Sequence, residues 1–195
     1  MSTIMRSDFI LEIFDRQSDI IIKNLEKVNH VAGGCIDVLF VCGADFGTQE
    51  SQFCSAETLS ELHGTAYRKI NGWVHRHTGW KTFKHCCGAI VPLMDTLIDC
   101  GFDIINPVQI NAAGMDPEFL KKEFGDRICF WGGGIDTQRV LQTGTPQQVK
   151  DQVRRLCEIF GADGGFVFNT VHNLQANVPV ENAFALMEAV REIRK

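Results

Sequence analysis

Short apolar runs alternate with amphipathic stretches along most of the chain. The helical spacing of apolar residues predicts a leading helix over 8–29. Gly33-Gly34, a few residues further on, is the signal that ends it. Five strand–helix units follow it. The expected strands are short, apolar and bounded by glycine, proline or polar residues: 36–42, 80–84, 103–106, 127–131 and 165–168. The expected helices are 56–77, 89–100, 117–124, 146–160 and 179–194.

Two of these helices carry start signals. Asp116 precedes Pro117 and Thr145 precedes Pro146, so each pair supplies an N-cap and a proline in the first turn. Alternating strands and helices predict an α/β fold with a parallel sheet and helical crossovers. Both an open doubly wound sheet and a piece of a (β/α)8 barrel fit this order, and in both of them ligands bind at the carboxyl ends of the strands.

Polar and glycine-rich residues gather at those carboxyl ends. They form the segments Asp45 to Gln49, His85 to Gly88, Asn106 to Gln109, Gly132 to Asp136, and Asn169 to Asn173. Because the carboxyl ends of parallel strands share one rim, these segments indicate a site of the barrel type. We therefore expect TIM-barrel-type units in an incomplete barrel of about five strands.

Composition narrows the function classes. The 195 residues fit a single domain, 1–195, and the net charge of −5 comes from acidic and basic residues mixed along the chain, so no basic stripe suggests nucleic acid. No apolar run approaches the ~18 residues that span a bilayer. The first residues lack the apolar core of a signal peptide, so we expect a soluble, cytoplasmic protein without a membrane partner.

The eight cysteines do not have the spacing of a secreted disulfide framework. Among the segments that contain cysteine, His85-Cys86-Cys87-Gly88 is the most informative, because it lies at the end of an expected strand. Side chains alternate along a strand, so His85 and Cys87 share one side and Cys86 points away. With His172 from the last rim segment as a third donor, one position stays open, as in catalytic zinc sites. A core histidine beside a buried thiol is the alternative interpretation.

Other rim residues have both a functional and a structural interpretation. Asp45 could orient a zinc-bound histidine or contact substrate, or it could form a turn before Gly47. Asn106 and Gln109 could bind substrate or serve as turn residues. Asp136 follows three glycines that let the backbone approach a ligand, and Asn173 could line the rim or cap its turn. The histidines of the second helix are placed on its solvent-facing side and given no role: His63, His75 and His77.

Several segments in order resemble the uroporphyrinogen decarboxylase superfamily, particularly its corrinoid- and thiol-linked methyltransferase branch. They cover most of the chain: Asp45 to Gln49, Lys84 to Gly88, Asp103 to Gln109, Gly114 to Asp116, Leu120-Lys121 with Phe124 to Asp126, Phe130 to Asp136, and His172-Asn173 with Val178 to Asn182. The resemblance implies a (β/α)8 barrel of which this chain holds only the C-terminal five units. The sheet edges left open by this would be covered by the leading helix, by a second copy or by a partner chain, unless the chain is a fragment.

The methyltransferase branch binds zinc through a His-x-Cys-Gly strand end and a Cys or His after the last strand, and His85, Cys87 and His172 occupy these positions. The resemblance implies a zinc-dependent transfer of methyl between a corrinoid on a separate protein and a thiol or methylated small molecule. We assign Asp45 a catalytic role. Substrate binding is assigned to Gln49, Asn106, Gln109, Asp136 and Asn173.

Two rival functions remain. The first is a decarboxylase-like enzyme of tetrapyrrole metabolism. It is disfavoured because the arginines and the aspartate that handle the porphyrinogen carboxylates lie mostly in the N-terminal part of those proteins. The second is a catalytically inert truncated barrel that serves as an assembly subunit.

Overall fold

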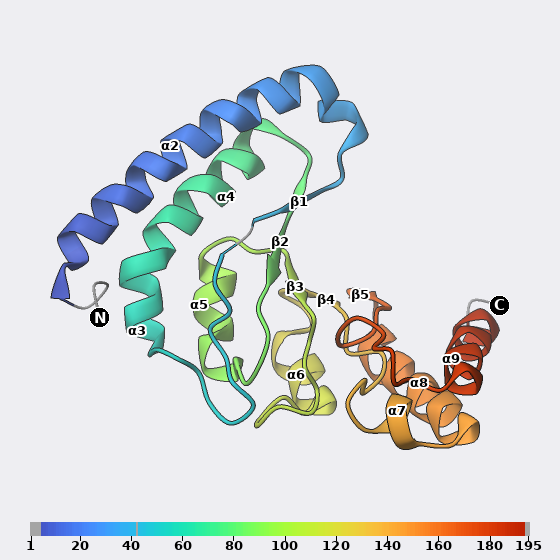
Figure 1. The fold of residues 1–195 in the computed structure, drawn as a ribbon. Coiled ribbons are helices and arrows are strands. Elements are labelled where there is room, and N and C mark those ends of the chain that lie inside the picture. Colours follow the sequence, from blue (N-terminus) through green and yellow to red (C-terminus); the bar gives the residue numbers. More distant parts are fainter. Residues whose placement is uncertain (1–4, 42, 194–195) are drawn as a thin grey trace.

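A single parallel sheet of five strands organises the chain. The computed structural model describes residues 5–41 and 43–193. The strands lie side by side in sequence order, and each pairs in parallel with the next (Figure 1). They are β1 (Val38–Phe40), β2 (Lys81–His85), β3 (Ile104–Asn106), β4 (Cys129–Trp131) and β5 (Phe166–Val167). In the part of the chain that is described, β1 and β5 form the two edges of an open sheet. The predicted α/β class with five parallel strands is confirmed.

A helix or a pair of helices follows every strand, as predicted. The first unit contains α3 (Ala56–Leu59), a π-helical turn (Ser60–Gly64) and α4 (Thr65–His77), and the second contains a 3₁₀ turn (Val91–Leu93) and α5 (Met94–Asp99). The later units carry α6 (Pro117–Phe124), α7 (Val140–Thr143), α8 (Pro146–Gly161) and α9 (Val180–Ile193). The short helix α7 was not predicted, because four residues are too few to show a helical period.

The leading helix α2 (Ser7–Ala32) runs alongside α4 (Figure 1). Although it has 26 residues, only Ser18 and Leu25 are buried. Neither α2 nor any other helix within residues 5–41 and 43–193 is both long and apolar enough to cross a membrane. The helix therefore lies on the molecule with most of its surface uncovered.

The two faces of the sheet have different surroundings. Thr82 and Lys84 of β2 are fully buried, whereas Phe83 and His85, which alternate with them, are half-buried. On the buried side, Phe130 of β4 packs against Phe160 of α8 with ring centroids 5.1 Å apart. This alternation makes one face of the sheet the core and leaves the other face for the site.

A row of aromatic rings crosses that second face. Phe83 lies between two other rings, with centroid distances of 5.4 Å to Phe40 and 5.4 Å to Trp131. Phe40 remains 53% exposed. The row lies on the side of β2 from which His85 projects, so the candidate site sits at the carboxyl end of a half-covered aromatic surface.

The predicted caps are present. The carboxylate of Asp116 accepts a hydrogen bond of 2.9 Å from the backbone N–H of Phe119. Thr145 and Gln148 form a reciprocal capping box, in which each side chain accepts from the other residue's backbone N–H. Both helices therefore begin where their sequence signals place them.

We expect Thr145→Ala to destabilise the protein by about 1 kcal/mol, because the first turn of α8 would lose its side-chain acceptor. Urea unfolding followed by circular dichroism measures this change. Thr145→Ser keeps the hydroxyl and is the matched control, for which we expect little loss. Equal losses in both variants would mean that the methyl group, not the cap, carries the effect.

Candidate metal centre

Three side chains with metal-binding atoms meet at the carboxyl end of the sheet. Asp45 comes from the loop after β1, while His85 and Cys87 come from the end of β2. Their ligand atoms all lie within 4.8 Å of one another, and they are the one group of this kind in the described part of the chain. The Cys87 Sγ lies 3.3 Å from His85 Nε2, and Asp45 Oδ1 lies 3.9 Å from the same nitrogen.

His85 is held in one orientation by Asn106. The parallel register places Asn106 of β3 opposite His85, and the Asn106 Oδ1 lies 2.6 Å from His85 Nδ1. The other end of the amide donates a hydrogen bond of 2.7 Å to the Trp131 carbonyl, which fixes Oδ1 as the atom facing the imidazole. This network assigns the proton to Nδ1, so the lone pair of Nε2 points toward Cys87. Metal-binding histidines are commonly held in this way.

Two contacts hold the loop that carries Asp45. The backbone N–H of Cys87 donates to Asp45 Oδ1 over 3.0 Å. The buried Lys84 donates from Nζ to the Ala44 carbonyl over 3.1 Å. Sequence reasoning gave Lys84 no role, although strand alternation could have placed it on the core side between Phe83 and His85. It is a positioning residue for the Asp45 loop.

Two glycines let this loop cross the end of β2 at close range. Gly88 has a φ of +90°, and a Cβ built there would lie 2.6 Å from the carbonyl oxygens of Gly47 and Thr48. A Cβ on Gly47 would lie 2.6 Å from the Cys87 carbonyl oxygen. The crossing is further held by Gln109, whose Oε1 accepts from the Gly88 N–H over 2.9 Å. Close backbone packing therefore sets the position of Asp45 beside Cys87.

Cys86 and Cys87 have separate surroundings. Cys86 is buried and its Sγ accepts a hydrogen bond from the Phe46 N–H, so it faces away from the group. Burial raises the pKa of the Cys87 thiol to about 11, and the nearby charge of Asp45 adds to this shift. Without a cation, Cys87 is consequently a neutral thiol at physiological pH, because its thiolate would lie half-buried beside the Asp45 carboxylate.

The remaining predicted residues lie outside this group. His172 is exposed in the segment after β5, where its Nδ1 accepts from the Asn173 N–H, so its role as a ligand stays a prediction.

Among the residues predicted to bind substrate, Asp136 is buried, and its Oδ1 accepts from the N–H groups of Gln138 and Arg139 at the turn before α7. Gln49 is exposed. The substrate roles of Gln49, Asn106, Gln109, Asp136 and Asn173 likewise stay predictions.

The placement of His63 was wrong. It lies between aromatic rings instead of facing solvent, with centroid distances of 5.1 Å to Phe14 and 5.0 Å to Phe46. Burial lowers the pKa of His63 and favours its neutral form. The cause is α2, which covers this side of the second helical segment and which a single-helix pattern does not reveal.

The donor set suits a borderline-soft divalent cation. Imidazole nitrogen, thiolate sulfur and carboxylate oxygen are the three ligand types of zinc in proteins. A cation would also offset the repulsion that otherwise disfavours a Cys87 thiolate beside the Asp45 carboxylate. Asp45, His85 and Cys87 therefore fit a zinc ion, with Asn106 orienting the histidine.

Comparisons with known proteins agree with this fold. The sequence model of the uroporphyrinogen decarboxylase (URO-D) family matches residues 8–193. A uroporphyrinogen decarboxylase of Vibrio campbellii is 34% identical over 97 residues, which are 45% of this chain and 26% of that protein. One of Aliivibrio salmonicida is 34% identical over 76 residues, 38% of this chain and 21% of that protein. These alignments thus cover about a quarter or less of each relative.

A solved structure extends the comparison to the whole chain. The methyltransferase from Methanosarcina mazei superposes with a TM-score of 0.71 at 18% sequence identity. The match covers 100% of this chain and 52% of that chain. The five strand–helix units therefore share the fold of about half of a larger protein.

Proposed function

The chain belongs to the uroporphyrinogen decarboxylase family, and on that premise we propose that it is the zinc-binding part of a methyltransferase. The reaction moves a methyl group between a corrinoid carried by another protein and a thiol or methylated small molecule. The observation that supports this most is the meeting of Asp45, His85 and Cys87 on the rim, with His85 already oriented by Asn106. Decarboxylation gives no reason for a thiol and an imidazole to be held 3.3 Å apart.

The chemistry of the transfer balances with these components. Zinc held by the three side chains would supply a positive charge that favours the thiolate form of a thiol substrate. The thiol loses its proton to solvent water, a sulfur–carbon bond forms, and the cobalt–carbon bond breaks with both electrons left on cobalt. The corrinoid is the methyl-carrying substrate of this step.

The residues of the chain hold and orient the reacting groups. The proton on His85 Nδ1 is donated to Asn106 Oδ1, which leaves the lone pair of Nε2 available to bind a metal ion. Asp45 supplies a carboxylate whose position is set by the Cys87 N–H. The side chains of His85 and Asp45 are 35% and 44% exposed, so a small thiol can reach the group from solvent. His172 is proposed as a further ligand from the opposite side of the rim.

The experiment uses protein loaded with one equivalent of zinc, methylcobalamin as the methyl donor and 2-mercaptoethanol as the acceptor. We expect zinc-dependent loss of the methylcobalamin absorbance and formation of the methyl thioether, and His85→Ala should abolish both. A folded protein that binds no zinc would contradict the proposal. If zinc binds but no methyl group is transferred, the proposed metal site is supported and methyl transfer by this chain alone is excluded.

The curated relatives favour a second candidate, decarboxylation of a porphyrinogen, because both aligned proteins are uroporphyrinogen decarboxylases. Incubation with uroporphyrinogen followed by a count of the carboxyl groups in the product tests it. Decarboxylation that persists after zinc removal and in Cys87→Ser would support this candidate over methyl transfer.

We expect Asn106→Leu to lower zinc affinity about 10- to 100-fold, because His85 would lose the acceptor that fixes its ring and tautomer. Competition with a chromogenic chelator measures the affinity. Asn106→Asp keeps an acceptor for Nδ1 and should recover a large part of the loss. An unchanged affinity in Asn106→Leu would show that Asn106 does not position the ligand.

A further inference from the structure

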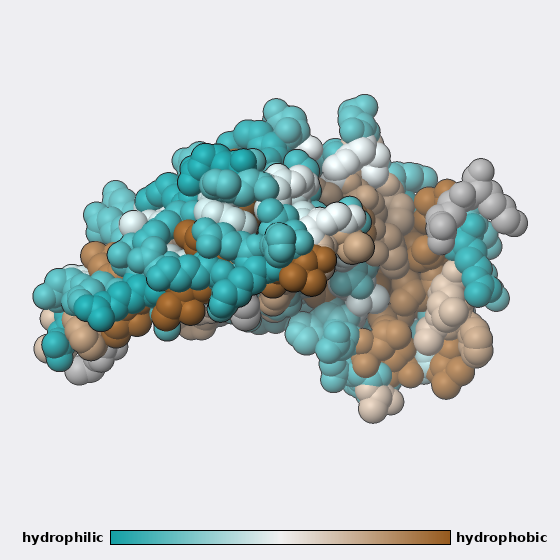
Figure 2. All heavy atoms as spheres, turned by 90° about the horizontal axis from the view of Figure 1, so that it is seen from above, coloured by the Kyte–Doolittle hydropathy of each residue, from teal (hydrophilic) through white to brown (hydrophobic). Residues whose placement is uncertain are grey.

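One face of the sheet runs from the candidate metal centre toward the amino ends of the strands. Side chains alternate along β2, so His85, Phe83 and Lys81 project from this face. The parallel register adds apolar residues of the other strands to the same face: Phe40, Ile104, Trp131 and Val167. Figure 2 shows hydrophobic residues over the middle of the molecule, between the more hydrophilic ridge of α2 and the end where α9 lies. Between the polar rim and Lys81, the face is therefore largely apolar.

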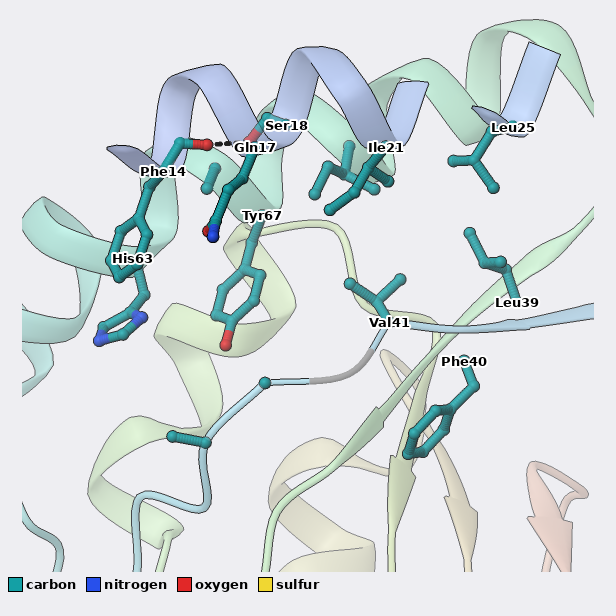
Figure 3. A pocket seen from close by; sticks show the side chains of 14 residues that line it. Phe14, Gln17, Ser18, Ile21, Leu25, Leu39, Phe40, Val41, His63 and Tyr67 are labelled. Atoms are coloured by element: carbon teal, nitrogen blue, oxygen red, sulfur yellow. Dashed lines mark hydrogen bonds between the residues drawn. The ribbon is translucent and has the colours of Figure 1, made fainter. Parts of the chain in front are cut away.

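Phe40 is the part of this face that opens to solvent beside the metal-binding group. Figure 3 shows Leu39 and Val41 directed toward α2, whereas Phe40 lies on the other side of β1. Phe40 is 53% exposed, and its ring centroid lies 6.5 Å from that of His85. From Phe40 the aromatic row continues across β2 to β4. A ligand whose reacting atom lies at the metal-binding group therefore meets aromatic rings next to it.

The charges of the metal-binding group decide which substrates the row accepts. A zinc ion would bring two positive charges, which the Cys87 thiolate and the Asp45 carboxylate offset, while His85 stays neutral with its proton on Nδ1. A substrate thiolate would then leave the assembly with a net negative charge. A second anionic group on the substrate would be repelled by that charge, because the two groups lie close together in a small molecule. A thiol with a sulfonate or carboxylate arm is therefore disfavoured.

The cation of this face does not compensate an anionic arm. Lys81 lies four residues before His85 on β2, which is about 13 Å along the strand. Its Nζ already lies 3.7 Å from Asp103 Oδ1. An ammonium arm keeps its water and so leaves the rings uncovered, whereas the gain from an apolar arm grows with the area that it covers. The arm that suits the row is consequently neutral and apolar.

We infer that this site takes, as its methyl acceptor, a neutral thiol with an aromatic or similarly apolar arm. The sulfur lies at the metal-binding group, and the arm lies on the row of Phe40, Phe83 and Trp131. The inference rests on the proposed function, since it names the acceptor of that reaction and adds no step to it. Benzyl mercaptan is the simplest such thiol, because one carbon joins its sulfur to a ring that can pack on other rings.

Four thiols test the inference on protein loaded with cobalt(II), in which coordination by a thiolate adds an absorption band in the near ultraviolet. They are benzyl mercaptan, 2-mercaptoethanol, the anionic 2-mercaptoethanesulfonate and the cationic cysteamine, compared at equal thiolate concentration. We expect benzyl mercaptan to bind at least about tenfold more tightly than 2-mercaptoethanol, because its ring covers more apolar area. The sulfonate should bind most weakly. Equal affinities, or tightest binding of the sulfonate or of cysteamine, would overturn the inference.

Variants of Phe40 show whether the row binds the arm. Phe40→Ala should weaken the binding of benzyl mercaptan at least about fivefold and leave that of 2-mercaptoethanol unchanged. Phe40→Tyr keeps a ring and should retain the preference. Phe184→Ala removes a ring of similar exposure, 60%, from α9 and is the matched control. Equal weakening of both thiols in Phe40→Ala, or the same loss in Phe184→Ala, would contradict a contact between the arm and the row.

Two further measurements separate this inference from the proposed function. Saturation-transfer NMR on the metal-free protein reports contact between the phenyl protons of benzyl mercaptan and the protein, and this signal should fall in Phe40→Ala. Absence of the signal would overturn the inference even if the protein bound no metal. Methyl transfer from methylcobalamin is measured with the same thiols. The expected binding preference without transfer would support the thiol site and reject the transfer, whereas equally efficient transfer to every thiol would do the reverse.

Discussion

Cys87→Ser is expected to lower the zinc affinity of the protein about 100-fold or more. Losses of 10- to 100-fold follow the removal of partners that only orient a ligand, and Cys87 is proposed as a ligand itself. A serine hydroxyl holds its proton far more tightly than a thiol and supplies no anionic donor. Of the three ligands that meet at the end of β2, zinc would then keep only Asp45 and His85. Chelator competition, with elemental analysis of the purified protein, measures both affinity and content.

Two variants make that result interpretable. Cys157→Ser changes a half-buried thiol of α8 outside the group and should retain the zinc of the parent protein. Cys86→Ala removes the buried neighbour, which faces Phe46, and should affect stability more than affinity. If Cys87→Ser keeps full affinity, or if Cys157→Ser loses it, the metal does not bind at the proposed group.

The part of the site that follows from strand geometry could be predicted from the sequence. Period-two alternation places His85 and Cys87 on one side of β2 and Cys86 on the other, which the hydrogen bond from the Phe46 N–H bears out. The partnership of His85 with Asn106 was not predicted. It depends on the register between β2 and β3, which the sequence of each strand alone does not specify.

The rest depends on contacts between loops, which have no period. Asp45 reaches Cys87 because two glycines let its loop cross the end of β2, and no pattern within either loop indicates that crossing. His172 was assigned to the same rim by strand order and by the family resemblance. In the described residues the sheet is open and the group at β2 forms without His172, whose role as a ligand stays a prediction. Rim membership is thus a weaker predictor of contact in an open sheet than in a closed barrel.

The fold was predicted more completely than the site. Strand–helix alternation and the caps at Asp116 and Thr145 are local signals, and the structure has all five units in the expected order. The leading helix was predicted too, but its consequence for His63 was not. That consequence arises because α2 packs on α4, a contact between segments far apart in the sequence.

Gly88→Ala is expected to disrupt the site through the backbone, without removing any ligand. Gly88 has a φ of +90°, which an alanine adopts only with strain. Its Cβ would also collide with the carbonyl oxygens of Gly47 and Thr48, so the two loops must separate. Strain and overpacking together predict a loss of about 3 kcal/mol or more in the free energy of unfolding. Separation of the loops also moves Asp45 away from Cys87, so zinc affinity should fall with stability.

Gly114→Ala separates strain from collision. Gly114 has a φ of +75°, but a Cβ there meets nothing within 4 Å, so this variant carries the backbone strain alone and should lose about 1 kcal/mol with its zinc affinity intact. Urea unfolding and chelator competition on both variants supply the comparison. Equal effects of the two substitutions on zinc would contradict the crossing as the element that positions Asp45. A larger loss of affinity in Gly88→Ala, measured where both variants are fully folded, would show that the packing of two backbones, and not the three ligands alone, builds the metal centre.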